Sequence, residues 1–161
     1  MSTRMRRAFA GITGGFSLVE LLIVVAIAAV LAGLALPNYQ FMLVNMEIRG
    51  ISFDLVTQMM FARSEALKRN STVQIDPVGG DWNKGWQIKF GSDVLREQPP
   101  VKRVDVAVSP ASTTSIRFSQ TGRVSNGALA IQISDAAGKS PEISCVTVGL
   151  TGIASSRKGA C

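Results

Sequence analysis

The sequence contains no histidine, and this absence excludes several classes of function. Histidine is the commonest general base in enzymes and a common protein ligand of zinc. Without it, His-dependent metal sites and Ser-His or Cys-His nucleophile pairs are excluded. Paired carboxylates, a phosphate-binding glycine loop and metal-ligand spacings are not evident in the sequence either. We therefore expect a protein that is not an enzyme and that holds no metal ion or other cofactor.

Cysteine is nearly absent as well, since the chain has only Cys145 and Cys161. Two cysteines are too few for a Cys-only zinc site, and these two are too far apart for a Cys-x-x-Cys redox motif. Two interpretations remain at this point, which are a single disulfide and a pair of free thiols.

Charged residues are sparse, at 17% of the 161 residues, against roughly 25% in typical soluble domains. Hydrophobic residues make up 47%, and the formal net charge is +6. This composition is not that of a disordered chain, and the length suits one domain with a packed core.

Charge is missing altogether between Glu20 and Glu47, and residues 21–36 include no polar side chain. The 21 residues of 16–36, at about 1.5 Å per residue, form a helix roughly 30 Å long, which matches the hydrocarbon thickness of a bilayer. Three arginines precede this run, at positions 4, 6 and 7. The positive-inside rule then places the N-terminus in the cytoplasm and the rest of the chain on the other side of the membrane.

The apolar run has three interpretations. A buried core helix is disfavoured, because so small a domain cannot cover a helix that is apolar all round. A secretory signal cleaved after Ala35 is opposed by Glu20, an unusual residue at the start of such a run. A retained anchor is favoured, because a carboxylate within the hydrocarbon region costs about 2.5–3.5 kcal/mol and marks a functional site with a partner.

The residues around Glu20 resemble a known motif. Gly14-Gly15-Phe16-Ser17-Leu18-Val19-Glu20-Leu21-Leu22 is similar to the class III leader junction of type IV pilins and type II secretion pseudopilins. The resemblance implies cleavage by the membrane prepilin peptidase after Gly15 and N-methylation of Phe16. It also implies that Glu20 pairs with the N-terminal ammonium of a neighbouring subunit, which would offset the cost of burying the acid.

Helical spacing continues beyond Pro37, which we expect to kink one long helix rather than end it. Apolar side chains recur every three or four residues, at Ile48, Ile51 or Ser52, Leu55, Met59, Ala62 and Ala66. Glu65 and Arg69 form an i,i+4 pair in the favourable order, and Asn70-Ser71 ends the helix.

Phe61-Ala62-Arg63-Ser64-Glu65-Ala66 is similar to the Ala-Arg-Ser-Glu-Ala signature of the GspH/FimT family of minor pilins and pseudopilins. Together with the leader motif and the later Phe118-x-x-x-Gly122 pattern, this resemblance covers most of the chain. In energetic terms, we interpret Arg63 and Glu65 as residues that merely solvate the helix.

In the last ninety residues, apolar and polar side chains alternate along short segments, which is typical of strands. Six short strands are expected, around Thr72–Asp76, Trp86–Phe90, Val104–Val108, Ile116–Phe118, Leu129–Ile133 and Val146–Leu150. The predicted fold is α+β and type IV pilin-like, in which antiparallel sheet covers the outer half of a long N-terminal helix. The expected parts are a leader at 1–15, a transmembrane helix half at 16–36, an amphipathic half at 37–70 and a β-rich domain at 71–161.

Export into an oxidising compartment favours a disulfide between Cys145 and Cys161 over free thiols. A C-terminal disulfide loop resembles that of type IV pilins more than that of secretion pseudopilins. It therefore favours a pilus subunit that primes or caps the filament, with a type II secretion pseudopilin as the alternative. The expected partners are the prepilin peptidase, other pilins and the assembly machinery. The expected location is the bacterial inner membrane, crossed once, and then the filament.

Binding of DNA during uptake is a third hypothesis. Some FimT-type proteins bind DNA through arginines in a Gly-Arg-x-Arg context, but here Thr151-Gly152-Ile153-Ala154 lacks the arginine. Arg157 and Lys158 offer substitute phosphate contacts, although a solvated charged loop is the favoured interpretation. Trp82 and Trp86 could offer a stacking platform for bases, but the favoured interpretation places Trp86 in the core and Trp82 at the edge of its strand.

Overall fold

The computed structural model describes residues 15–161, except for the side chains of residues 34–38. Apart from Gly15, the predicted leader lies outside the described residues. A division between Asn38 and Tyr39 separates two units, and each is considered by itself.

One helix, α1 (Leu18–Arg69), begins in the first unit and ends in the second. The helix is assigned through Pro37, so this proline does not end it, as predicted. Among the described residues, no helix combines the length and the apolarity needed to cross a membrane. The span expected over residues 16–36 stays a prediction.

The helix ends where the sequence predicted. Asn70 has a φ of +49°, the left-handed conformation in which helices commonly end. The amide of Ser71 then donates to the carbonyl of Ala66, which satisfies one of the free carbonyls of the last turn. Lys68 and Arg69 occupy that turn, where positive charge opposes the helix dipole.

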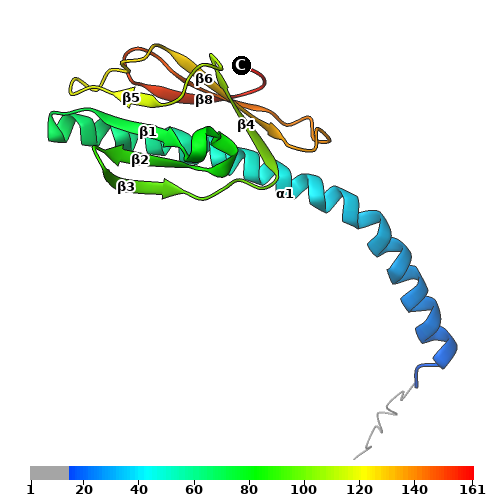
Figure 1. The fold of residues 1–161 in the computed structure, drawn as a ribbon. Helices are drawn as coiled ribbons and strands as arrows, with labels where there is room; N and C mark the ends of the chain where they lie inside the picture. Colours follow the sequence, from blue (N-terminus) through cyan, green and yellow to red (C-terminus); the bar gives the residue numbers. More distant parts are fainter. Residues whose placement is uncertain (1–14) are drawn as a thin grey trace, which may run out of the picture. The chain divides into compact units, whose positions relative to one another are not determined.

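The second unit packs two antiparallel sheets with the later part of α1 (Figure 1). The first sheet has the order β3-β2-β1-β5. Its strands are β1 (Val73–Pro77), β2 (Trp86–Phe90), β3 (Asp93–Gln98) and β5 (Ile116–Phe118). The second sheet has the order β4-β6-β7-β8. Its strands are β4 (Val104–Ser109), β6 (Leu129–Asp135), β7 (Ser144–Val148) and β8 (Ala154–Lys158).

The core of this unit is one apolar cluster shared by the helix and both sheets. The helical row predicted from three- and four-residue spacing supplies one side of it, and every member of that row is buried, including both Ile51 and Ser52. Trp86 and Phe118 are the largest side chains that are fully buried. The predicted α+β fold is therefore confirmed, with the long helix covered by antiparallel strands.

Two details of the strand prediction are wrong. The described residues form eight strands in two sheets rather than six strands. The two missed strands, β3 and β8, lie at sheet edges and have mostly exposed side chains, so neither carries an alternating apolar pattern. Leu150 was placed in the last predicted strand, but β7 ends at Val148 and the Leu150 side chain is exposed in the following turn.

Two short 3-10 turns, η1 (Val78–Gly80) and η2 (Trp82–Lys84), connect β1 to β2. Asn83 of η2 reaches across to β4, where its side-chain oxygen accepts a hydrogen bond from the Val106 amide at 2.8 Å. Its side-chain nitrogen donates to Asp105 at 3.0 Å. These contacts attach the turn of the first sheet to the edge strand of the second.

Candidate assembly site

The predicted processing site lies just before the helix. Gly15 and Phe16 are not helical, and α1 begins at Leu18, with Glu20 in its first turn. A negative charge is favourable there because it opposes the positive end of the helix dipole. A Cβ atom built on Gly15 would meet nothing within 4 Å, so the described fold does not demand glycine at this position. Cleavage after Gly15, N-methylation of Phe16 and pairing by Glu20 stay predictions.

In residues 15–33 of the first unit, every large apolar side chain is exposed. Phe16 and Leu18 are 74% and 75% exposed, and the values from Val19 to Leu31 are 55% or more. These side chains surround the helix on all sides, as the uniform apolar composition predicts. This segment therefore needs an apolar environment that the described chain does not itself provide.

A second exposed apolar surface lies on the part of α1 that belongs to the second unit. Met46, Phe53, Met60 and Leu67 are 55%, 70%, 60% and 49% exposed and occur at intervals of seven residues. At 3.6 residues per turn, this spacing keeps them in one slowly drifting row, which runs from about 160° to about 100° around the helix from the buried row. We call these four residues the helix stripe. Sequence reasoning missed the stripe because it followed only the row that covers the sheet, although the seven-residue spacing was visible in the sequence.

Arg63 of the family signature does more than solvate the helix, which corrects the sequence-based interpretation. Its Nε donates to the carbonyl oxygen of Gly122 at 3.0 Å, and the two residues are 59 positions apart. The turn at Gly152 packs against the same carbonyl, since a Cβ on Gly152 would lie 2.0 Å from the Gly122 oxygen. Both glycines have positive φ, of +72° and +76°. The signature thus connects the helix to two separate turns.

Glu65, the acid of the signature, remains on the helix surface as expected. Arg69 Nε donates to its carboxylate at 2.6 Å, and the Lys68 ammonium lies 3.8 Å from it. The hydrogen bond from Arg69 is the main cause that lowers the pKa of Glu65 below its ordinary value. The predicted i,i+4 pair is therefore confirmed.

Glu142, in the loop between β6 and β7, forms a charged junction with the helix and with β8. Its carboxylate lies 3.1 Å from Nε of Arg49 on α1 and 3.1 Å from Nζ of Lys158 on β8. The hydrogen bond from Lys158, followed by that from Arg49, lowers the pKa of Glu142. These pairs link segments that are distant in the sequence.

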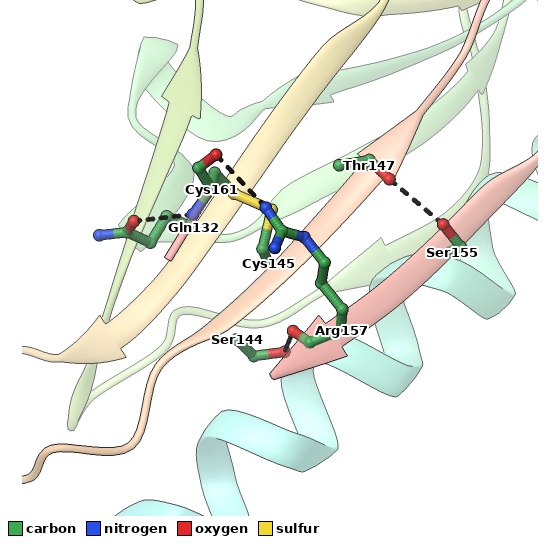
Figure 2. The surroundings of a disulfide bond; sticks show 7 residues. All are labelled: Gln132, Ser144, Cys145, Thr147, Ser155, Arg157 and Cys161. Atoms are coloured by element: carbon green, nitrogen blue, oxygen red, sulfur yellow. Dashed lines mark hydrogen bonds between the residues drawn. A yellow bond between two sulfur atoms is a disulfide. The ribbon is translucent and has the colours of Figure 1, made fainter. Parts of the chain in front are cut away.

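The disulfide predicted between Cys145 and Cys161 is present, with Cα atoms 5.1 Å apart. Figure 2 shows it on the second sheet, beside Gln132 of β6 and Arg157 of β8. The Cys161 amide donates to the Gln132 side chain at 3.3 Å, and Arg157 Nη2 donates to the Cys161 carbonyl at 3.4 Å. The segment after β8 is therefore held across β7 and β6.

Arg157 and Lys158, the predicted phosphate contacts, do not converge. Successive side chains of a strand point to opposite faces. Arg157 is directed at Cys161 (Figure 2), whereas the Lys158 ammonium contacts Glu142. Contact with DNA through these two residues stays a prediction, and the geometry offers no joint phosphate clamp.

Trp86 is a core residue, as the favoured interpretation held, and Trp82 belongs to the same core rather than to the strand edge. Trp86 is fully buried, and Trp82 is 7% exposed, with ring centroids 6.0 Å apart. The indole nitrogen of Trp86 donates to the Gln58 side chain at 2.6 Å, so its polar group is satisfied inside the domain. Neither ring offers an open face for stacking on a base.

Comparison with known proteins gives two family matches. The model of Type II transport protein GspH matches residues 54–152, and that of the prokaryotic N-terminal methylation motif matches residues 13–36. No curated protein matches the chain.

Two crystal structures of the type IV minor pilin FimU of Pseudomonas aeruginosa (strain PAO1) have a similar fold. In space group P21 the TM-score is 0.59 at 18% identity, over 71% of this chain and 89% of that chain. In space group P65 the TM-score is 0.58 at 18% identity, over 70% and 92%. At this identity the likeness concerns the fold alone.

Proposed function

The chain belongs to the GspH family of pilin-like proteins, and from this premise we propose that it is a minor type IV pilin that helps to prime or cap the filament. The proposal includes cleavage by the prepilin peptidase after Gly15 and methylation of Phe16, which the match to the N-terminal methylation motif supports. The role proposed is structural rather than enzymatic.

The observation that carries the proposal is the helix stripe. Each large apolar side chain that moves from water to a packed interface contributes about 1.5–3 kcal/mol before the cost of association. The seven-residue spacing matches that of helices that pack side by side along a shared seam. The buried row holds the sheets while the stripe stays largely exposed, with Leu67 beside the Gly122 turn, so α1 can pack in a helical bundle without unfolding the domain.

The N-terminal half of α1 would enter the same bundle. Before assembly, its exposed apolar side chains would be solvated by the inner membrane, crossed once with the N-terminus in the cytoplasm. In the bundle, similar helices replace lipid around it. Glu20 would then pair with the N-terminal ammonium of a neighbouring subunit, and the cost of burying its charge would set the axial register.

A pseudopilin of the type II secretion system is the second candidate, and the description of the matching family model favours it. The C-terminal disulfide loop favours the pilus, because it resembles that of type IV pilins. Binding of DNA is not favoured, because Arg157 and Lys158 face opposite sides of their strand.

Gene deletion in a host that has both systems distinguishes the two candidates. A pilus subunit predicts loss of surface pili with normal secretion of exported enzymes, and complementation restores the pili. Loss of secretion with normal pili would instead assign the chain to the secretion system. Mass spectrometry of the mature protein tests processing, and an N-terminus at Met1 or Leu36 would contradict cleavage at Gly15.

A further inference from the structure

Among the described edge strands, β3 and β8 have outward backbone groups without a backbone partner outside the sheet ladder, and only β8 pairs with its neighbour in an unbroken register. A free edge strand offers unpaired N–H and C=O groups to another chain, so proteins usually cover or disrupt such edges. The two sheets have four edge strands, which are β3, β5, β4 and β8. The edges of β4 and β5 are contacted by other segments of the chain, and the pairing of β3 is irregular.

The edge of β4 is covered by Asn83, whose side chain accepts a hydrogen bond from the Val106 amide. That of β5 is covered by the following segment, because the Ser125 amide donates to the Arg117 carbonyl at 2.9 Å. The pairing of β3 is interrupted by a register shift on β2, and Arg96 of β3 stacks 4.3 Å from the Phe61 ring. The contacts at β4 and β5 occupy edge groups, and the register shift breaks the regular ladder at β3, so β8 is the open edge with a regular register.

The pairing register of β8 with β7 shows which backbone N–H and C=O groups of β8 have no hydrogen-bond partner among the described residues. Gly149 donates its amide to the Ile153 carbonyl, and Gly159 donates to the Ile143 carbonyl. Bonded and non-bonded pairs alternate in an antiparallel ladder, so Ser155 and Arg157 also face β7. The N–H and C=O groups of Ala154, Ser156 and Lys158 consequently point to the free edge. Within residues 15–161, no hydrogen bond to these groups from outside the β7–β8 ladder is present.

An open cavity of about 400 Å³ lies beside this edge and is bounded on the other side by α1. Three consecutive residues of β8, from Ser156 to Lys158 and including Arg157, contribute to its wall together with Ser144 of β7. Arg49, Ser52 and Phe53 contribute from the helix. An added strand would therefore have room beside β8. The local charge is positive, because Arg49 and Lys158 share the single carboxylate of Glu142.

We propose that the β8 edge binds an extended acidic segment of a partner protein by strand addition. The backbone groups of Ala154, Ser156 and Lys158 would pair with the segment, while alternate side chains enter the cavity. Two positive side chains, Arg49 and Lys158, share one negative side chain, Glu142, so one positive charge remains in excess. Arg157 adds a further positive charge on the opposite face of β8. This excess of positive charge favours an acidic partner. This interaction shares Phe53 with the helix stripe and otherwise uses different residues, those of β8 and Arg49.

The test uses the full chain in detergent micelles and a fluorescein-labelled ten-residue peptide that alternates glutamate with threonine and valine. We expect Ser156→Pro to weaken binding at least tenfold, because proline removes an N–H that points to the free edge and not to β7. Lys158→Glu should weaken binding by a similar factor. Ser155→Ala is the matched control and should bind as the unmodified chain does, because its backbone faces β7 and only an outer side chain changes.

Amide hydrogen exchange gives a second measurement that needs no variant. On the unmodified chain, the peptide should slow exchange at Ala154, Ser156 and Lys158 and leave Ser155 and Arg157 unchanged. Absence of peptide binding, or unchanged exchange at the three outward amides, overturns the proposal.

Other probes separate strand addition from simple charge attraction. A lysine version of the peptide should bind at least tenfold more weakly, and equal binding overturns the choice of an acidic partner. A double-stranded oligonucleotide that binds the unmodified chain and Ser156→Pro equally, with no binding of the acidic peptide, would assign the basic residues to nucleic acid and overturn the proposal.

Discussion

Arg63 on α1 donates a hydrogen bond to the carbonyl oxygen of Gly122 at 3.0 Å. The same guanidinium Nε would lie 3.3 Å from a Cβ atom on Gly152. The carbonyl of Gly122 is therefore enclosed between a helix side chain and the turn that connects β7 to β8. The turn at Gly152 has no space for a side chain, because a Cβ there would lie 2.0 Å from the Gly122 carbonyl oxygen, whereas a Cβ on Gly122 would meet only the side chains of Arg63 and Leu67 at 3.0–3.2 Å.

Substitution of Gly152 by alanine tests this junction. A left-handed residue with a Cβ costs roughly 1–2 kcal/mol, and the clash with the Gly122 carbonyl should add about 1–3 kcal/mol. Gly138→Ala is the matched control, because Gly138 has a φ of +64° and open space around it. Chemical denaturation should show a larger loss of stability for Gly152→Ala, and equal losses would show that the close contact is unimportant.

Acid should destabilise the domain through Glu142 and Asp135. The pKa of Glu142 is lowered by Lys158 and Arg49, and that of Asp135 by backbone amides, first that of Ala137. A carboxyl whose folded-state pKa is lowered contributes stability above its unfolded pKa and loses it as the pH falls through the folded value. Unfolding measured from neutral pH to below the ordinary values of 3.8 and 4.5 should therefore show falling stability.

The two acids should respond differently to salt. The interactions of Glu142 are with exposed cations and are screened by salt, whereas those of Asp135 are local hydrogen bonds. Glu142→Gln should reduce the acid dependence at low salt and have little effect at high salt. Acid dependence that is identical in Glu142→Gln and the unmodified chain would contradict this assignment.

Loss of the disulfide should destabilise the second sheet. The bond closes a loop with a sequence separation of 16, and a loop of this size contributes about 3 kcal/mol in the chain-entropy model. Denaturation with and without reductant measures this loss. The double variant Cys145→Ser with Cys161→Ser should resemble the reduced protein and be insensitive to reductant. Equal stability of the oxidised and reduced forms would exclude a stabilising role.

Replacement of Glu20 by alanine should leave insertion into the membrane intact and lower incorporation into filaments. The carboxylate disfavours the hydrocarbon region unless a cation pairs with it, so its removal makes insertion easier and removes the pairing signal. Membrane fractionation and recovery of sheared filaments measure the two effects separately. Normal incorporation of Glu20→Ala would contradict the proposed pairing.

Sequence patterns predicted those helices and strands in which buried apolar side chains recur at a regular spacing. The row from Ile48 to Ala66 had to face a core, because apolar residues at helical spacing are stable only when covered. Strands such as β6 alternate between buried and half-buried positions and were predictable for the same reason. The helix stop at Asn70 followed from its tolerance of positive φ.

The missed features depend on backbone pairing and on contacts between distant segments. β8 has the sequence Ala-Ser-Ser-Arg-Lys and pairs with β7 through its backbone, so its side chains carry no burial pattern. The contact of Arg63 with Gly122 joins residues 59 positions apart, and no local spacing reports it. Arg157 and Lys158 are neighbours in sequence, but their strand separates them onto opposite faces.

In the proposed function, α1 assembles the protein into a filament through the helix stripe. The most direct test is incorporation of the double variant Phe53→Ser with Met60→Ser into sheared filaments, measured by immunoblot against the unmodified chain. Leu150→Ser is the matched control, because Leu150 is 52% exposed but lies in the β7–β8 turn. We predict at least a tenfold loss for the stripe variant, with normal membrane levels, and no loss for the control. Incorporation of the stripe variant at the level of the unmodified chain would contradict the claim.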